Sequence, residues 1–318
     1  MDCPEERKNR HELERAGAGH PLDQHDHSRI LSRRKEGESR RIVHIGGVEI
    51  GGNGLVVIAG PCAVESSAQI RDTALFVASA GARVLRGGSF KARTSPYAFQ
   101  GLGIEGVRMM REAADEAGLP MVTEILSEKD LPAMEPYVDA FQVGSRNMDN
   151  TALLKELGAV RKPVVLKRGF AATITEWLLA AEYILVGGNP NVILCERGIR
   201  TFSRDTRFTL DLAGAVLAHQ RSSLPVIIDP SHATGKPDLV VPLAAAAVAA
   251  GLDGLMVEVH PHPSAALSDA EQALAPESFH EMMHRVAAVG EAVGRPVMKS
   301  VGLPTGPAAA TGGSVSGT

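Results

Sequence analysis

The chain has 318 residues, of which 44% are hydrophobic and 4% aromatic, so it is long enough for one large domain with a substantial core. Its formal net charge of −4 gives no basic stripe for nucleic acid, and no apolar run approaches the roughly 18–20 residues of a membrane span. The charged N-terminus lacks the apolar segment of a signal peptide, and Cys3, Cys62 and Cys195 are too few for a disulfide framework. We therefore predict a cytoplasmic protein with reduced thiols that binds neither nucleic acid nor membrane.

The first 41 residues are polar and rich in Arg, Glu and His, without a sustained apolar period. We expect residues 1–41 to form a flexible arm, with a short helix near residues 4–15. RIVHIGGVEIGGN (41–53) then alternates apolar and polar residues around a Gly-Gly pair. This pattern predicts a short β-hairpin.

Short apolar runs alternate with helical patterns after the hairpin, and their starts lie roughly 30 residues apart, the length of one strand–helix unit. The runs begin near residues 55, 83, 120, 140, 163, 191, 225 and 254. Such a series predicts an α/β fold, a (β/α)8 TIM barrel within residues 42–302, whose bottom the hairpin could plug. An open doubly wound sheet is the alternative. The small-residue tail 303–318 is expected to be disordered.

The helical segments carry recognisable end signals. Gly81 and Gly118 each follow an amphipathic stretch as C-caps, and Thr173 with Glu176 forms a capping box. Pro242 lies within another helical segment (238–251), where proline is tolerated if it falls in the first turn.

Nearly every apolar run stops on, or just before, a residue able to do chemistry. These residues are Cys62, Arg86, Glu124, Arg146, Lys167, Cys195 with Glu196 and Arg197, Asp229 with His232, and Glu258. Packing of a core does not require a charged residue at the same end of every strand. An active site at one mouth of a barrel does require such residues. An open sheet would gather such residues at one switch point instead.

One group of these residues suggests a metal site. Cys62, His232, Glu258 and Asp269 follow the first, seventh and eighth strands, and the eighth strand pairs with the first in a closed barrel. A thiolate, an imidazole and two carboxylates favour Mn, Fe, Co, Zn or Cu over Mg or Ca. Each residue alone could be structural, and Asp269 could be a helix cap. Cys195 is the rival thiol, which we interpret as structural because it lies across the barrel from His232.

A second group suggests an anion site. Seven cations follow the second, fourth, fifth and sixth strands, namely Arg86, Lys91, Arg93, Arg146, Lys167, Arg197 and Arg200. They would repel one another strongly unless an anion such as phosphate or carboxylate neutralises them. The alternative is a set of surface side chains paired with Asp or Glu. The long loop 91–103 at the predicted mouth favours a binding role.

Seven sequence blocks occur in order across about residues 42–290. They are AGPCAVES (59–66), RGGSFKARTSPYAFQGLG (86–103), FQVGSRNM (141–148), LKRG (166–169), NVILCERGIRTF (191–202), DPSHATGK (229–236) and EVHPHPSAALSDAEQAL (258–274). Together they resemble the 3-deoxy-D-arabino-heptulosonate 7-phosphate (DAHP) synthases of the class I beta subgroup. The sister enzyme, 3-deoxy-D-manno-octulosonate 8-phosphate synthase, shares the barrel and the phosphoenolpyruvate (PEP) pocket. It has Asn where this chain has Arg93 and Thr94, so the resemblance favours the heptulosonate enzyme.

The resemblance implies condensation of PEP with D-erythrose 4-phosphate and water to DAHP and phosphate, the first step of the shikimate pathway of aromatic amino acid biosynthesis. It implies a divalent metal cofactor with Cys62, His232, Glu258 and Asp269 as ligands. Mn2+ is the preferred ion, and Fe2+, Co2+ and Zn2+ are the alternatives. It implies substrate contacts from Arg86, Lys91, Arg93, Thr94, Glu124, Arg146, Lys167 and Arg197. It implies that Lys91 reaches both substrates and is a candidate proton donor. The catalytic candidates are therefore Lys91 and two of the implied metal ligands, Cys62 and His232.

Several residues in the predicted mouth loops depart from those common in the family, although none is an implied ligand. They are Ala92, Ser203, Phe208, Ala233 and His262. The departures leave open a related synthase of a secondary pathway that uses a modified aldose, and a non-catalytic scaffold for a partner such as a chorismate mutase is the alternative outside enzymes. The resemblance implies a homodimer or homotetramer. Residues 1–41 are too short for the regulatory domain of some members, so we expect no feedback inhibition by an aromatic amino acid.

Overall fold

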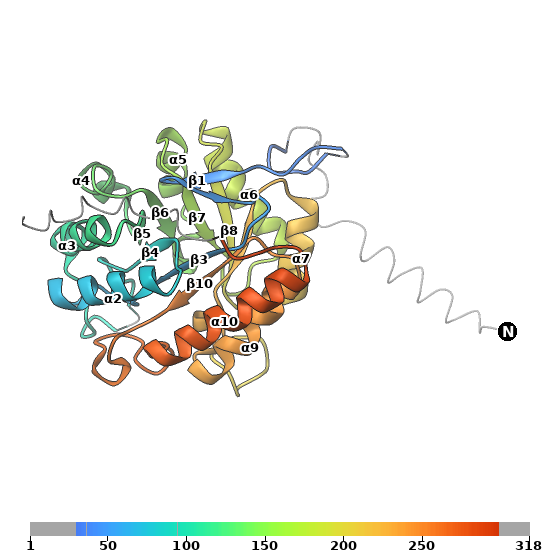
Figure 1. Cartoon of the computed structure of the whole chain (residues 1–318). Helices are drawn as coiled ribbons and strands as arrows, with labels where there is room; N and C mark the ends of the chain where they lie inside the picture. The colour runs from blue at the N-terminus through green and yellow to red at the C-terminus, as the bar shows by residue number, and fades with distance from the viewer. Residues whose placement is uncertain (1–29, 36, 94, 299–318) are drawn as a thin grey trace, which may run out of the picture.

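The computed structural model describes residues 30–35, 37–93 and 95–298. Within that part, parallel strands form a closed barrel that helices surround (Figure 1). The strands are β3 (Val56–Gly60), β4 (Val84–Arg86), β5 (Met121–Glu124), β6 (Ala140–Val143), β7 (Val164–Lys167), β8 (Val192–Glu196), β9 (Val226–Ile228) and β10 (Gly254–Glu258). They follow one another around the barrel in chain order, and β10 pairs with β3. The predicted (β/α)8 barrel is confirmed, and the open sheet is excluded.

The helices surround the barrel. They are α2 (Ser67–Ser79), α3 (Gly103–Ala117), α4 (Leu131–Met134), α5 (Thr151–Ala159), α6 (Ile174–Val186), α7 (Leu212–Arg221), α8 (Pro230–Thr234), α9 (Pro237–Ala249) and α10 (Pro276–Ala292). The short helix α8 carries His232 to the mouth of the barrel. The capping box of Thr173 and Glu176 is confirmed at the start of α6, and Gly118 ends α3 in the left-handed conformation. Gly81 lies one residue beyond the C-cap of α2.

Pro242 does not fall in the first turn of its helix. Helix α9 begins at Pro237, because proline is preorganised for the first helical position, where its missing N–H costs nothing. Pro242 therefore lies in the second turn, inside the helix, where the carbonyl of Asp238 lacks its usual N–H partner.

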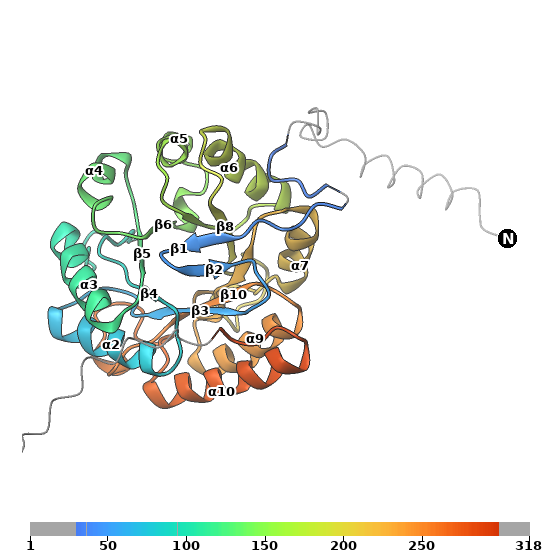
Figure 2. The ribbon, with the colours of Figure 1, turned by 45° about the horizontal axis from the view of Figure 1, so that its top comes forward.

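The predicted hairpin is confirmed as β1 (Val43–Ile45) paired antiparallel with β2 (Val48–Ile50). The apolar residues of both strands are buried and the polar residues between them are exposed. Figure 2 shows the hairpin lying across one end of the barrel. Its buried side chains join the interior cluster formed by inward-facing strand residues such as Val56 and Ile58. The hairpin therefore closes the bottom of the barrel with apolar groups, and the opposite end remains for polar chemistry.

A second apolar cluster lies between the strands and the surrounding helices. Alternate strand residues such as Val57 and Leu85 face outward and pack against helix residues such as Ile70 and Val107, as the two-residue period of a strand requires. These two layers hold the strand ends in register. In the described part of the chain, no helix is long and apolar enough to span a bilayer.

The end of the predicted N-terminal arm contacts the barrel. The backbone amides of Leu31 and Ser32 donate to the Glu182 carboxylate on α6, and the amide of Arg34 donates to the carbonyl of Arg221 at the end of α7. The expected helix near residues 4–15, Cys3 and the predicted tail 303–318 lie outside the described residues.

Candidate active site

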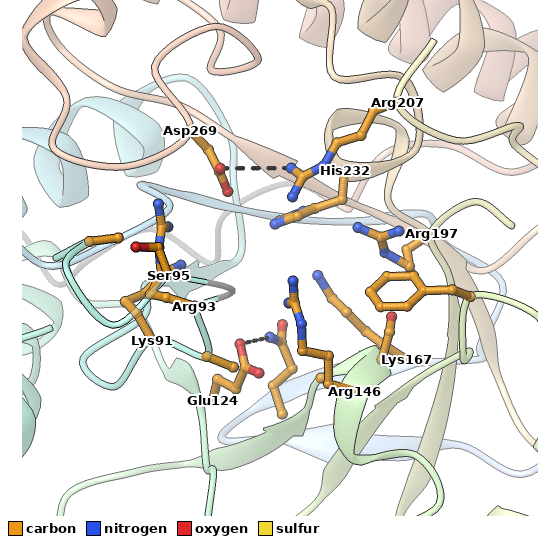
Figure 3. A pocket seen from close by; sticks show the side chains of 16 residues that line it. Lys91, Arg93, Ser95, Glu124, Arg146, Lys167, Arg197, Arg207, His232 and Asp269 are labelled. Carbon is orange, nitrogen blue, oxygen red and sulfur yellow. Dashed lines mark hydrogen bonds and ion pairs between the residues drawn. The ribbon is translucent and has the colours of Figure 1, made fainter. Parts of the chain in front are cut away.

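A cavity of about 290 Å³ opens at the carboxyl ends of the strands, opposite the hairpin. We call it the mouth cavity. Charged side chains line it, among them Lys91, Arg93, Glu124, Arg146, Lys167, Arg197, Arg207, His232 and Asp269. Figure 3 shows the side chains of Arg146, Lys167 and Arg197 on one side of this cavity and those of Lys91 and Arg93 on the other. Thr94 lies outside the described residues.

The four predicted metal ligands lie together beside this cavity. Donor atoms of Cys62, His232, Glu258 and Asp269 all lie within 4.8 Å of one another. The pairing of β10 with β3 sets Glu258 opposite Gly60, two residues before Cys62. The Cys62 Sγ lies 3.1 Å from Asp269 Oδ2, and His232 Nε2 lies 3.1 Å from Glu258 Oε1. Sulfur, nitrogen and carboxylate oxygen in one cluster fit a divalent transition metal.

Asp229 orients the imidazole of His232. Its Oδ2 lies 2.7 Å from His232 Nδ1, and its Oδ1 accepts the backbone amide of His232 at 2.9 Å. In the tautomer whose Nδ1 donates to Asp229, the lone pair of Nε2 faces the other candidate ligands. Burial lowers the pKa of His232, although Asp229 and Glu258 oppose that effect. The neutral imidazole that binds metal is therefore the favoured form.

The Arg86 guanidinium contacts one of the candidate metal ligands. Its Nη1 donates to Glu258 Oε1 at 2.8 Å and to the carbonyl of Pro61 at 2.8 Å, and both side chains of the ion pair are buried. Although burial disfavours a charged carboxylate, His232 and Arg86 hold the pKa of Glu258 below its usual value. Arg86 does not line the mouth cavity, so it supports a candidate metal ligand directly.

The thiol of Cys62 and the ammonium of Lys91 form a buried pair. Lys91 Nζ donates to Cys62 Sγ at 2.9 Å and to the Cys62 carbonyl at 2.9 Å. Burial, reinforced by the charge of Glu258, raises the pKa of the Cys62 thiol to about 12. The thiol is therefore protonated near neutral pH until a bound cation displaces the proton. The same ammonium lines the mouth cavity and so connects the metal candidates with a bound substrate.

Asp269 occupies a strained backbone conformation. Its φ of 51° is the one positive value among the described non-glycine residues, and this region is uncommon for a residue with a side chain. Burial disfavours its charge, but His232, the Cys62 thiol and Arg207 hold the pKa of Asp269 at about 2. The strain therefore accompanies a carboxylate that is ionised at neutral pH.

We call the side of the cavity with Arg146, Lys167 and Arg197 the cation side. It combines a lysine that is paired with a carboxylate and an arginine that has an unpaired N–H group. Lys167 Nζ contacts Asp229 Oδ2 at 2.5 Å, the same oxygen that orients His232. Arg197 is 4% exposed, and its Nη1 has no hydrogen-bond partner among the described residues. Burial lowers the pKa of Arg197 to about 10, so it stays charged at neutral pH.

Two other predicted residues lie at different places around the mouth. Glu124 lines the cavity and accepts a hydrogen bond from Gln142 at 3.3 Å. Its carboxylate passes close to Gly144, where an added Cβ would lie 2.0 Å from Glu124 Oε1. Arg200 does not line the cavity, although its guanidinium lies over the ring of Phe170.

Several residues of the site escaped prediction from the sequence. Arg207 lines the cavity and lies 3.7 Å from Asp269 Oδ1, and Phe170 also lines it. Gln272 donates to Glu258 and accepts from Arg207. None of these residues ends a strand, so the strand period gave no signal for them. The length of the loop between β8 and α7 was the available sign for Arg207.

Comparisons with known proteins agree with this geometry. The sequence matches the DAHP synthetase I family across residues 31–294. It is 49% identical over 253 residues to a phospho-2-dehydro-3-deoxyheptonate aldolase of Thermotoga maritima, covering 80% of this chain and 75% of that protein. A 2-dehydro-3-deoxyphosphooctonate aldolase of Koribacter versatilis is 31% identical over 270 residues, covering 78% and 96%. The crystal structure of the Thermotoga maritima DAHP synthase superposes with a TM-score of 0.82 at 47% identity, covering 84% of this chain and 78% of that one.

Proposed function

The chain belongs to the DAHP synthetase I family, and from that premise we propose that it condenses PEP with D-erythrose 4-phosphate and water in a metal-dependent reaction. The products are DAHP and phosphate, and the reaction is the first step of the shikimate pathway towards the aromatic amino acids. At the coarser level, the chain is an enzyme of the 3-deoxy-7-phosphoheptulonate synthase type, a transferase that joins PEP to an aldose phosphate. The observation that carries the proposal is a candidate metal cluster beside a cavity lined by cations.

The cluster fits a divalent ion by its donor set. Cys62, His232, Glu258 and Asp269 would hold Mn2+, with Fe2+, Co2+ or Zn2+ as alternatives, because sulfur and nitrogen donors disfavour Mg2+ and Ca2+. A bound ion supplies Lewis acidity that polarises the aldehyde of the aldose phosphate. Asp229 keeps His232 in the tautomer that can bind it, and Arg86 keeps Glu258 ionised.

The cations of the mouth cavity hold the two substrates in line. Arg146, Lys167 and Arg197 bind the phosphate and carboxylate of PEP, since guanidinium and ammonium groups both pair with such anions. Arg93, with Thr94 beside it in the sequence, binds the aldose phosphate. The two reacting carbons are thereby held close, which lowers the entropic part of the barrier.

Lys91 acts at the point where the substrates meet. The C3 carbon of PEP attacks the aldehyde carbon, and Lys91 gives its proton to the aldehyde oxygen. Water then adds at C2 of the former PEP and releases one proton, which restores the ammonium of Lys91. Phosphate then leaves with cleavage of its bond to C2. Burial alone would lower the pKa of Lys91, but Cys62 and Glu258 raise it above the usual value, so the ammonium is in the proton-donating form.

We infer a homodimer or homotetramer, a cytoplasmic location, and association with a partner such as a chorismate mutase. Light scattering of the purified chain, alone and with a chorismate mutase, tests the assembly. A monomer under all conditions would contradict it.

An aldose panel tests the proposed reaction. Purified enzyme with Mn2+ should consume PEP fastest with erythrose 4-phosphate, and metal analysis should find one ion per chain. A preference for arabinose 5-phosphate would favour the octulosonate reaction, and a preference for another aldose would favour a secondary pathway. No loss of PEP with any aldose phosphate would contradict the proposal, and would leave the non-catalytic scaffold as the better interpretation.

A further inference from the structure

Two stacked phenylalanine rings lie on the cation side of the mouth cavity. The rings of Phe170, after β7, and Phe208, in the loop between β8 and α7, have centroids 4.9 Å apart and an interplanar angle of 5°. The guanidinium carbon of Arg197 lies 4.3 Å from the centroid of Phe208 and 4.9 Å from that of Phe170. We propose that this ring pair positions Arg197 and leaves its charge available for the substrate anion. The inference rests on the proposed function, in which Arg197 binds PEP.

A comparison of two buried arginines shows what the ring pair achieves. Arg168, after β7, pairs with Glu196 at 3.0 Å and with Asp211 at 2.8 Å, so carboxylates neutralise its charge inside the protein. Arg197 is equally buried but forms no ion pair with any described residue, and its Nη1 has no hydrogen-bond partner among them. A carboxylate on Arg197 would compete with an anionic substrate. An aromatic face attracts a cation without occupying its N–H groups.

Backbone contacts hold both rings in place. The amide of Phe208 donates to the carbonyl of Ala233 at 2.8 Å, and the amide of Arg200 donates to the carbonyl of Phe170 at 2.7 Å. Gly198 lets the loop approach, because an added Cβ there would lie 2.7 Å from the Cβ of Phe208. The ring pair thus joins the loops that follow β7 and β8 to α8, whose His232 precedes Ala233.

The ring pair also contacts other cations of the mouth, but less closely. The guanidinium carbons of Arg146 and Arg200 lie 5.5 Å from the Phe170 centroid, and that of Arg207 lies 5.9 Å from the Phe208 centroid. Among the described residues, Arg197 is the cation whose contacts reach both rings. Loss of one ring should therefore affect Arg197 more than its neighbours.

The substitution Phe208→Leu tests the role of the rings, since it keeps an apolar side chain but removes the aromatic face. In the metal-loaded enzyme, the Kd of PEP from calorimetry and its KM should rise roughly tenfold, the equivalent of about 1.4 kcal/mol. The kcat and the KM of the aldose phosphate should change less than about twofold. Phe208→Tyr should restore PEP binding, because it restores the ring.

Phe202 offers a matched control in the same loop. It is 99% exposed, so Phe202→Leu makes the same chemical change without touching Arg197 and should leave every constant unchanged. A double-mutant cycle adds a second control, because Arg197→Lys removes the planar group that the rings contact. In that background Phe208→Leu should add little further loss of PEP affinity.

Three results would overturn the inference. PEP affinity could survive Phe208→Leu in a folded enzyme, the KM values of both substrates could rise equally, or the loss could be the same in the Arg197→Lys background. If the unaltered enzyme bound no PEP, the proposed function would fail separately. The crystal structure of Phe208→Leu would then still decide the role of the rings, since an Arg197 guanidinium in its original orientation would refute it and a displaced one would support it.

Discussion

The two sides of the mouth treat charge in opposite ways. On the metal side, formed by Cys62, His232, Glu258 and Asp269, Arg86 neutralises Glu258 and Asp229 orients His232, both by direct contacts within the protein. Lys167 of the cation side also pairs with Asp229. On the cation side, Arg197 rests on aromatic rings and keeps an N–H without a partner among the described residues. The difference teaches how one cavity serves two ligands. A resident metal ion needs ligands that the protein already orients. A substrate anion that binds and leaves in each turnover needs cations that are already oriented but still have N–H groups free to bind it.

Removal of a candidate metal ligand should have the largest effect. Cys62→Ala takes away the sulfur donor, and we expect activity to fall by more than about a hundredfold, because even a group that only supports a ligand is worth 10–100-fold. Metal content should fall with it, as measured by mass spectrometry of the purified protein. Cys195→Ala is the matched control, since Cys195 is buried inside the barrel, and it should keep both metal and activity. Full activity of Cys62→Ala would refute the metal site.

Asp229 lies where the two sides meet, so Asp229→Asn should affect both. The amide cannot hold the imidazole of His232 by charge, and Lys167 loses its buried counter-ion. Metal affinity should fall roughly tenfold to a hundredfold, and the KM of PEP should change with it. Metal titration and steady-state kinetics measure the two effects. Asp211→Asn is the control, because it removes a carboxylate from Arg168 instead, and it should leave metal affinity unchanged. If Asp229→Asn changed only the metal affinity or only the KM of PEP, Asp229 would not connect the two sides.

Metal uptake should depend on pH through one proton. At neutral pH His232 is neutral because burial lowers its pKa, and Asp269, whose pKa is about 2, is ionised. The Cys62 thiol, whose pKa is about 12, still holds its proton and must release it to bind metal. Metal affinity should therefore rise about tenfold per pH unit between about pH 6 and 8.

Calorimetry in buffers of different ionisation enthalpy measures this release directly, and one proton per ion is expected. In Cys62→Ala the release should disappear. No proton release from the unaltered protein would mean that Lys91, 2.9 Å from the sulfur, already keeps a thiolate there.

Much of the fold and the ligand cluster followed from the strand–helix period. The period places Cys62, His232 and Glu258 after strands that closure makes neighbours, and their proximity follows from topology alone. Their roles stay predictions, as does the role of each predicted substrate contact. The hairpin was also predictable, because two-residue alternation around a tight turn is a local signal.

The remaining features depend on distances between loops, which no local pattern encodes. The stacking of Phe170 on Phe208 joins segments from different strand–helix units. Arg86 shows another limit, because no local pattern encodes the pairing of its guanidinium with Glu258. The substrate contact that the resemblance implies for Arg86 stays a prediction. The turn that holds Pro242 depended on where its helix begins, and the start at Pro237 puts Pro242 in the second turn.

Arg207 lies at the rim between the two sides, so its removal should have the smallest effect. Its side chain is 38% exposed and lies 3.7 Å from Asp269 Oδ1, and such pairs contribute little, so changes of about two- to fivefold are expected. In Arg207→Gln the KM of the aldose phosphate should rise, because a cation near the anion is lost. Metal affinity should stay equal or increase slightly, because a positive charge beside Asp269 opposes cation binding. Arg204→Gln, in the same loop and exposed, is the control. Weaker metal binding in Arg207→Gln would instead place Arg207 on the metal side, as the residue that orients Asp269.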